Sequence, residues 1–256
     1  QAGYPAAYNN LIAVTAYSPD GLPAWYTNYG PGCNIAAPGG DAYEDPSTGR
    51  CSILSTLPNG RYGYMDGTSM ACPHVSGVAA LGLSYALKLG KTFTVDEYKA
   101  LLLTSVNDIN ARLVGTRESK ITQNLADYKG KMGTGTIDTF QVLMNVRGTR
   151  CIPVKVGGEE SINIQNYLGS GELGMKMTAV EMAASDMAAL GITEKPVVFG
   201  NNIVLKCTKP GAAIIKVNLI AGGTAAGGGA TMGGMLITKE FAIIARPAFA
   251  NNGGWL

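Results

Sequence analysis

The stretch GTSMACPHVSG, at residues 67–77, decides how this sequence is interpreted. It begins a run over residues 69–88 that is rich in Ala, Val, Leu and Gly. This run is apolar on nearly every side, which predicts a buried helix. A serine at the start of such a helix lies beside unpaired backbone N–H groups and the positive end of the helix dipole, so that an oxyanion formed next to the Ser69 hydroxyl would be stabilised. An isolated serine there would be a simple N-cap, and the surrounding sequence has to decide between the two roles.

Strand and helix patterns alternate in the first part of the chain. Residues 11–16 and 34–37 are short apolar runs bounded by Gly, Pro and Asn, which predicts buried strands. A second helix is predicted after Thr94, whose spacing from Glu97 is that of a capping box. A third helix is predicted over residues 138–146. Strands mixed with helices predict an α/β layered fold for this part of the chain.

The pattern changes after the third helix. Short apolar or alternating runs follow, separated by turn residues, at 152–156, 161–164, 203–207, 213–219 and 241–245. Long helices are not predicted, although residues 180–190 could hold a short one. The glycine-rich segment 221–235 lacks the residues of a phosphate-binding loop and is interpreted as a hairpin loop. We therefore expect two domains, residues 1–148 and an all-β sandwich over 149–256.

Residues 67–77 resemble the serine signature of the subtilisin-like proteases. Further motifs follow that family in order at residues 3–8, 11–14, 27–30, 35–39, 53–56 and 135–138. Several ordered motifs are far more specific than a lone Gly-x-Ser-x-Gly. The resemblance covers residues 1–147 and implies the C-terminal half of a subtilisin-like parallel-sheet domain. The β region is similar in general terms to bacterial immunoglobulin-like modules, and this likeness carries no functional residues.

The resemblance implies the roles of particular residues. Ser69 is the nucleophile, and its own backbone N–H is one oxyanion donor. Thr68 lies near the oxyanion, and Gly3 matches a position on the rim of the pocket that receives the substrate side chain. The Tyr4–Pro5 bond is expected to be cis, since the matching bond in the family often is. The implied activity is that of a serine endopeptidase, which cleaves polypeptides by Ser-His-Asp acyl transfer.

His74 is the only histidine of the chain, and it is not expected to be the catalytic base. Five helical residues rotate the chain by ~500°, so that His74 points about 140° away from Ser69. The resemblance implies a structural histidine buried against the core. The 68 residues before Ser69 hold no histidine, although subtilisin places its Asp and His before its Ser. Asp20, Asp41 and Asp45 are interpreted as solvated loop carboxylates.

We therefore expect the catalytic Asp and His to belong to an N-terminal half of the protease, which would be the partner of this chain. The chain by itself is expected to be inactive. Because the family's parallel sheet is buried on both faces, its first domain should expose apolar surface unless a companion chain or self-association covers it.

Composition argues against several other functions. The formal net charge is +2, which is too balanced for a nucleic-acid-binding surface. No apolar stretch is predicted to span a membrane, because Gly77, Gly82 and Ser84 interrupt the strongest one. Neither a cofactor nor a metal is predicted. At the family's weak cation site Asn34 stands in place of an acid, and calcium there is kept only as an alternative.

The five cysteines leave at least one thiol outside an internal disulfide. Cys33 and Cys51 flank an inserted loop and are the first expected pair, and Cys151 with Cys207 is the second. Cys72 is expected to be a free, buried thiol. A secreted or cell-surface location is expected from the family.

Three functions remain open at this point. The chain is a fragment of an active endopeptidase, a pseudo-enzyme that acts in surface interaction or adhesion, or a purely structural part of a multidomain surface protein. The intact motif around Ser69 favours the endopeptidase.

Overall fold

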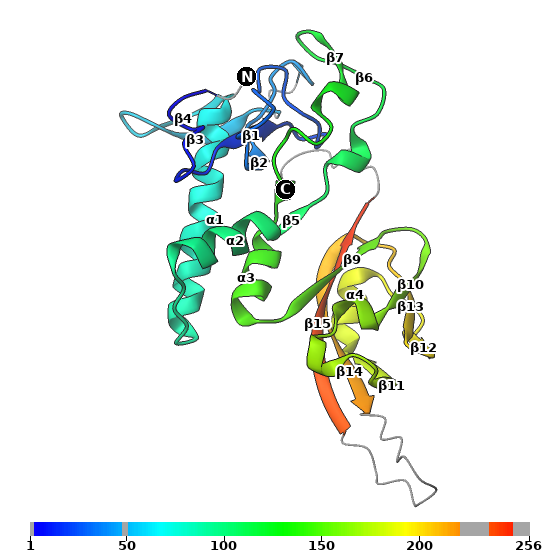
Figure 1. Cartoon of the computed structure of the whole chain (residues 1–256). Coiled ribbons are helices and arrows are strands. Elements are labelled where there is room, and N and C mark those ends of the chain that lie inside the picture. Colours follow the sequence, from blue (N-terminus) through cyan, green and yellow to red (C-terminus); the bar gives the residue numbers. More distant parts are fainter. Residues whose placement is uncertain (1–2, 48–50, 221–235, 248–256) are drawn as a thin grey trace, which may run out of the picture. The chain divides into compact units, whose positions relative to one another are not determined.

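The computed structural model describes residues 3–47, 51–220 and 236–247 (Figure 1). These residues form two compact units, one up to Arg147 and one from Gly148 onward. The glycine-rich segment 221–235, interpreted above as a hairpin loop, lies outside the described residues.

The first unit is built on a four-stranded sheet. Its strand order is β1 (Val14–Tyr17), β2 (Ile35–Pro38), β8 (Thr136–Ile137) and β5 (Val106–Asn107). The pairs β1–β2 and β2–β8 are parallel, whereas β5 runs antiparallel to β8. The two predicted strands lie at β1 and β2, and sheet and helices together confirm the α/β class.

Three helices accompany this sheet: α1 (Thr68–Lys88), α2 (Val95–Thr104) and α3 (Thr139–Arg147). The bounds of α1 and α3 and the start of α2 agree with the predicted ones to within a residue. The capping box at α2 is confirmed, because the Thr94 hydroxyl accepts from the Glu97 amide at 3.3 Å and the Glu97 carboxylate accepts from the Thr94 amide at 2.8 Å.

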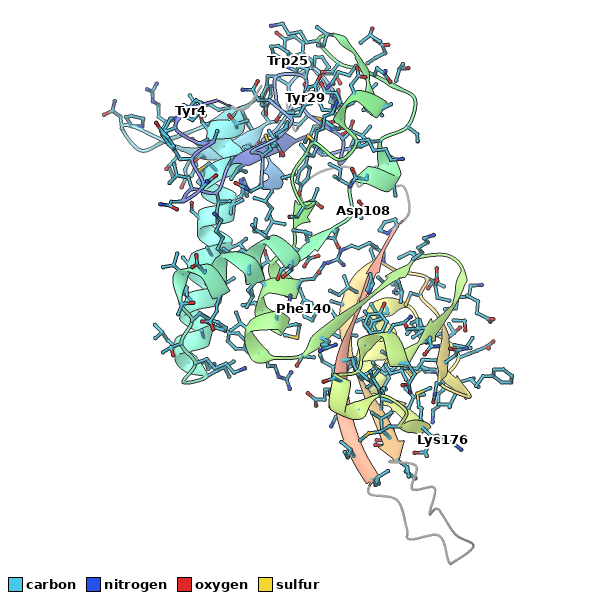
Figure 2. All side chains as sticks on the ribbon, viewed as in Figure 1. Tyr4, Trp25, Tyr29, Asp108, Phe140 and Lys176 are labelled. Atoms are coloured by element: carbon cyan, nitrogen blue, oxygen red, sulfur yellow. The ribbon has the colours of Figure 1, made fainter. Side chains whose placement is uncertain are left out.

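Two antiparallel hairpins complete the unit. One consists of β3 (Ile53–Leu57) and β4 (Arg61–Met65), the other of β6 (Thr116–Glu118) and β7 (Thr122–Asn124). The chain between β1 and β2 carries Trp25 and Tyr29, which are labelled in Figure 2. The Tyr29 ring lies 4.2 Å from the ring of Tyr128 and anchors the segment after β7.

Helix α1 is much less buried than its sequence predicts. Strands β1 and β2 and helix α3 pack against one side, where Ala71, Val75, Gly82 and Ala86 are buried. The opposite flank is apolar but open, with Leu87 75% exposed. A helix that is apolar all round needs cover on more than one side, and the described residues supply it on one.

The same helix also bears on the expectation that no segment spans a membrane. By length and composition alone, α1 is long and apolar enough to cross one. This is weak evidence, since the core helix of a soluble protein meets the same criteria.

The second unit consists of two sheets. One has the order β10 (Glu159–Asn163), β13 (Asn202–Lys206) and β12 (Val197–Phe199), and the other has the order β11 (Lys176–Met182), β14 (Gly211–Ile220), β15 (Leu236–Arg246) and β9 (Arg150–Lys155). All strand pairs are antiparallel except β15 with β9, which is parallel. Residues 180–190, where a short helix seemed open, divide between the end of β11 and helix α4 (Ala184–Leu190).

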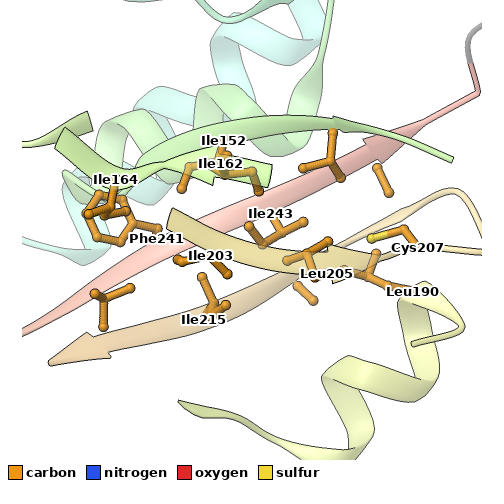
Figure 3. Close-up of a cluster of buried hydrophobic side chains, with 14 of the residues drawn as sticks. Ile152, Ile162, Ile164, Leu190, Ile203, Leu205, Cys207, Ile215, Phe241 and Ile243 are labelled. Atoms are coloured by element: carbon orange, nitrogen blue, oxygen red, sulfur yellow. The ribbon is translucent and has the colours of Figure 1, made fainter. Parts of the chain in front are cut away.

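One hydrophobic core holds this unit together, and Figure 3 shows it between the strands. Every second residue of β14 from Ala213 to Leu219 is buried, which is the period-2 pattern of a half-buried strand. Ile203 of β13 and Ile243 of β15 are fully buried in the same cluster.

Both expected disulfides are wrong. Cys33 and Cys51 are free thiols, and the inserted loop is closed instead by the Asp41 amide, which donates to the Cys51 carbonyl at 2.7 Å. Cys207 is also free, which excludes its pairing with Cys151. Cys72 is free as expected but exposed, because it lies on the uncovered flank of α1.

The two environments predict unequal thiol reactivity. Burial raises the pKa of Cys207 to about 11, so that only ~0.1% of it is thiolate at pH 8, and its side chain is inaccessible. We expect iodoacetamide to modify Cys72 in the folded chain and Cys207 only on unfolding, as measured by peptide mapping. Labelling in denaturant is the control, and equal rates in the folded chain would contradict the prediction.

Candidate active site

Ser69 lies at a turn from strand to helix. Strand β4 ends at Met65, Asp66 and Gly67 form the turn, and α1 begins at Thr68, so that Ser69 is the second helical residue. The placement predicted from sequence is confirmed. The side chain is exposed.

The turn is held against the end of β2. The Gly67 amide donates to the Gly39 carbonyl at 2.9 Å. A side chain at position 39 would not fit, since its Cβ would lie 2.5 Å from the Ala16 Cβ and 2.9 Å from the Gly67 oxygen. The Ala-Ala-Pro-Gly motif therefore ends in the residue that lets β2 and the turn meet.

The first turn of α1 offers free N–H donors beside the hydroxyl of Ser69. The amides of Met70 and Ala71 donate to the Gly67 carbonyl, at 3.0 and 3.2 Å. Within the described part of the chain, the amides of Thr68 and Ser69 make no such bond, and neither does the Ser69 hydroxyl. No acidic residue stands in the first helical turn. The arrangement can therefore bind a negatively charged oxygen at the Ser69 amide.

His74 is not part of this arrangement. Its Nδ1 lies 2.8 Å from the Met70 carbonyl, one turn back along the helix. Among the residues that the structure describes, no hydrogen bond joins it to Ser69, as the helical rotation predicts. The residue is half-buried, which is less cover than the expected position against the core would give. Its helix is covered on one side, which leaves the ring partly open.

The other two expected site residues are placed differently. Thr68 is half-buried and adjacent to Ser69 at the helix start. Gly3 is exposed, its carbonyl accepts from the Ala7 amide at 3.1 Å, and the Tyr4–Pro5 bond that follows is cis, as expected. Among the described residues, no hydrogen bond joins Gly3 to Ser69.

The interpretation of the aspartates as solvated is wrong for Asp20 and Asp41, which both pair with Arg117. Asp41 is fully buried and lies 2.7 Å from Arg117, whose guanidinium is also 2.6 Å from Asp20. Arg117 follows Asp41 by 76 positions, so that no local pattern reveals the pair. Asp45 is half-buried and accepts from the Ser47 amide at 3.1 Å.

The Asn34 side chain has a structural role in the first unit. Its side-chain oxygen accepts from the Ala13 amide at 2.7 Å, which joins the starts of β1 and β2. No group of three or more His, Cys, Asp or Glu among the described residues could hold a metal ion.

Comparison with known proteins shows which family the sequence matches. The subtilase (peptidase S8) family matches residues 1–135. The chain is 40% identical over 117 residues to the extracellular basic protease of Dichelobacter nodosus, covering 43% of this chain and 18% of that protein. It is 45% identical over 82 residues to subtilisin NAT of Bacillus subtilis subsp. natto, covering 32% and 19%. It is 44% identical over 85 residues to the major intracellular serine protease of Bacillus subtilis (strain 168), covering 33% and 23%. The chain thus spans about a fifth of the length of these relatives.

Solved structures are similar over a little more than half of the chain. A protease of Pseudoalteromonas arctica is 29% identical, with 56% of this chain and 38% of that chain covered and a TM-score of 0.42. The prenylagaramide maturation protease PagA is 29% identical, with 56% and 45% covered and a TM-score of 0.41. Since the family matches more than half of its 256 residues, the chain belongs to the subtilase family.

Proposed function

We propose that this chain carries the nucleophile of a subtilisin-type serine endopeptidase that cleaves polypeptides. The observation that carries the proposal is the exposed Ser69 at the start of α1, with its own amide unpartnered in the described structure. The Ser69 oxygen attacks the peptide carbonyl carbon and gives up its proton to a histidine base. The carbonyl oxygen becomes an oxyanion that the Ser69 amide binds, with Thr68 nearby. Gly3 is assigned to the rim of the substrate pocket by the resemblance alone.

The base and its aspartate are assigned to an N-terminal half of the catalytic domain. The one histidine in the sequence, His74, is hydrogen-bonded to the Met70 carbonyl, and its position on the helix directs it away from the Ser69 hydroxyl. The open apolar flank of α1, which includes Leu81, Leu83 and Leu87, is surface that such a half would cover. The chain alone is therefore proposed to be inactive.

The second unit is proposed to be an immunoglobulin-like accessory domain that spaces or anchors the protease. Sheets of three and four strands around one core support this proposal, as does the order of strands within them. The proposed domains are residues 1–148 and 149–256, and the division into compact units after Arg147 supports that boundary.

An extracytoplasmic location and the absence of a cofactor complete the proposal. One relative is named an extracellular protease and another an intracellular one, so that location has to be measured for this protein itself. Calcium is the alternative for the cofactor.

Fluorophosphonate labelling tests the proposed function. We expect no labelling of Ser69 in the chain alone and rapid labelling after addition of the N-terminal half. Protection of the exposed Cys72 thiol from iodoacetamide would report binding of that half independently of catalysis. Rapid labelling of the chain alone would show that inactivity is wrong. Binding without labelling would favour the pseudo-enzyme that acts in surface interaction.

A further inference from the structure

We propose that Asp66 is a positioning residue for Ser69, and that Arg117 holds it in place through the loop of residues 40–46. This inference rests on the proposed function, because it concerns how the nucleophile is kept in its reactive geometry.

Asp66 ties the nucleophile turn to the loop. Its Oδ2 accepts from the Ala42 amide at 2.7 Å, while the next residue, Gly67, donates its amide to the Gly39 carbonyl at 2.9 Å. Two consecutive residues of the turn are thus fixed to two points of the segment 39–42. Since Gly67 precedes α1 and accepts the first amides of the helix, these two bonds set the direction in which the Ser69 amide and hydroxyl face.

Tyr26 fixes the same segment from the other side. Its hydroxyl lies 2.7 Å from the carbonyl oxygens of both Gly39 and Gly40. Burial, aided by the Asp66 charge, raises the pKa of Tyr26 well above its ordinary value, so that the hydroxyl keeps its proton and remains a donor. The segment that holds the turn is therefore held in place by Tyr26.

Arg117 determines where Ala42 lies. Asp41, the residue before Ala42, is fully buried, and its Oδ2 is 2.7 Å from Arg117 Nη1. The same guanidinium binds Asp20 at 2.6 Å and Glu44 at 3.4 Å, which ties both ends of the segment 41–44 to strand β6. A buried ion pair with several charge-assisted hydrogen bonds restrains the positions of its partners.

The hairpin β6–β7, which carries Arg117, makes two further contacts with the loop, one at Asp41 and one at Tyr43. Ser119 Oγ lies 2.9 Å from both carboxylate oxygens of Asp41. The Lys120 ammonium lies 4.2 Å from the centre of the Trp25 ring and 5.3 Å from that of Tyr43. The loop is therefore rigidly held where it meets the turn of Asp66.

The carboxylate of Asp66 is more than a packing element. Its Oδ1 is buried without a hydrogen-bond partner among the described atoms, which is unfavourable for stability. The Oδ2 bond of 2.7 Å is in the range of charge-assisted hydrogen bonds, which are about twice as strong as neutral ones. The unpaired Oδ1 is thus accompanied by a strong hydrogen bond at Oδ2, which restrains the position of the turn.

Kinetics of the complete protease test the inference. A misplacement of ~1 Å lowers reactivity by up to ~10²-fold. We expect Asp66→Ala to reduce kcat by ~10- to 100-fold with KM changed less than about 3-fold. Asp66→Asn keeps an acceptor for the Ala42 amide and should restore kcat to within about 5-fold of wild type.

Arg117→Lys keeps the charge but not the forked geometry, and its loss of kcat should lie between those of Asp66→Asn and Asp66→Ala. Glu172→Gln, which breaks the Glu172–Lys239 ion pair of the second unit, is the control and should leave kcat unchanged.

Amide hydrogen exchange provides a readout that does not depend on catalysis. Asp66→Ala should speed exchange at Met70 and Ala71 in the 256-residue chain, and Asp66→Asn should do so much less. Wild-type kcat in Asp66→Ala, equal losses in the Ala and Asn variants, a change in KM alone, or unaltered exchange at α1 would each overturn the inference. A wild-type protease that fails to label with fluorophosphonate would instead refute the proposed function, and exchange would still test the positioning.

Discussion

Replacement of Ser69 by alanine in the complete protease is expected to lower kcat by ~10⁶-fold, to the low level left by substrate binding and the oxyanion donors. The reason is that the hydroxyl is the attacking group, whereas the amide that binds the oxyanion belongs to the backbone and survives the substitution. Steady-state cleavage of a peptide substrate measures the loss, and a thermal melt verifies that the exposed position tolerates alanine.

Ser76→Ala is the matched control. Ser76 lies on the same helix, is exposed, and within the described residues donates from its hydroxyl only to the Cys72 carbonyl at 3.3 Å. Its loss should leave kcat within about 2-fold, because alanine removes only a hydroxyl that is hydrogen-bonded to its own helix. Equal effects of the two substitutions would remove Ser69 from the nucleophile role.

Local patterns predicted the elements that depend on neighbouring residues. Thr94 and Glu97 meet across three positions, so that their capping box can be derived from spacing alone. The alternating residues of β14 mark one face of a strand for the same reason. Ser69 was found because the start of a helix and its chemistry both lie within a few residues of the chain.

Features that depend on distant residues could not be predicted. The burial of Asp41 requires Arg117, which the sequence separates from it by 76 positions. The polarity of a loop aspartate is equally consistent with solvent, and only the hairpin β6–β7 shows otherwise. Asp66 was missed as well, because its partner is a backbone amide, which leaves no mark in the sequence. A buried charge pair can be suspected from sequence only where its partners are near each other.

The exposure of α1 and of His74 is greater than the sequence predicts, for a reason unrelated to distant partners. The apolar composition of the helix indicates a surface that is suited to burial on all sides. Burial itself is a property of everything that packs around the helix, and one side is covered by the described residues. The difference between composition and exposure is the physical basis for the proposed N-terminal half.

Phe241→Ala is expected to destabilise the second unit by about 3–5 kcal/mol, which is the usual effect of removing a buried aromatic side chain. Phe241 is fully buried in β15, within the core of Figure 3 and opposite Ile215 of β14. Alanine would leave a cavity in this core, and the loss of stability grows with the part of the cavity that the surrounding side chains do not fill. Urea-dependent hydrogen exchange in peptides of β14 measures the change in the free energy of unfolding.

Phe199→Ala is the control, since this ring lies on β12 and is 77% exposed. Its removal should change the free energy of unfolding by less than about 0.5 kcal/mol, because little apolar area is returned to water. Peptides of α3, in the first unit, should exchange alike in both variants. Comparable losses for Phe199→Ala and Phe241→Ala would show that the two sheets do not enclose the core around Phe241. A large loss confined to Phe241→Ala would establish that one hydrophobic core, closed by β15, stabilises the second unit.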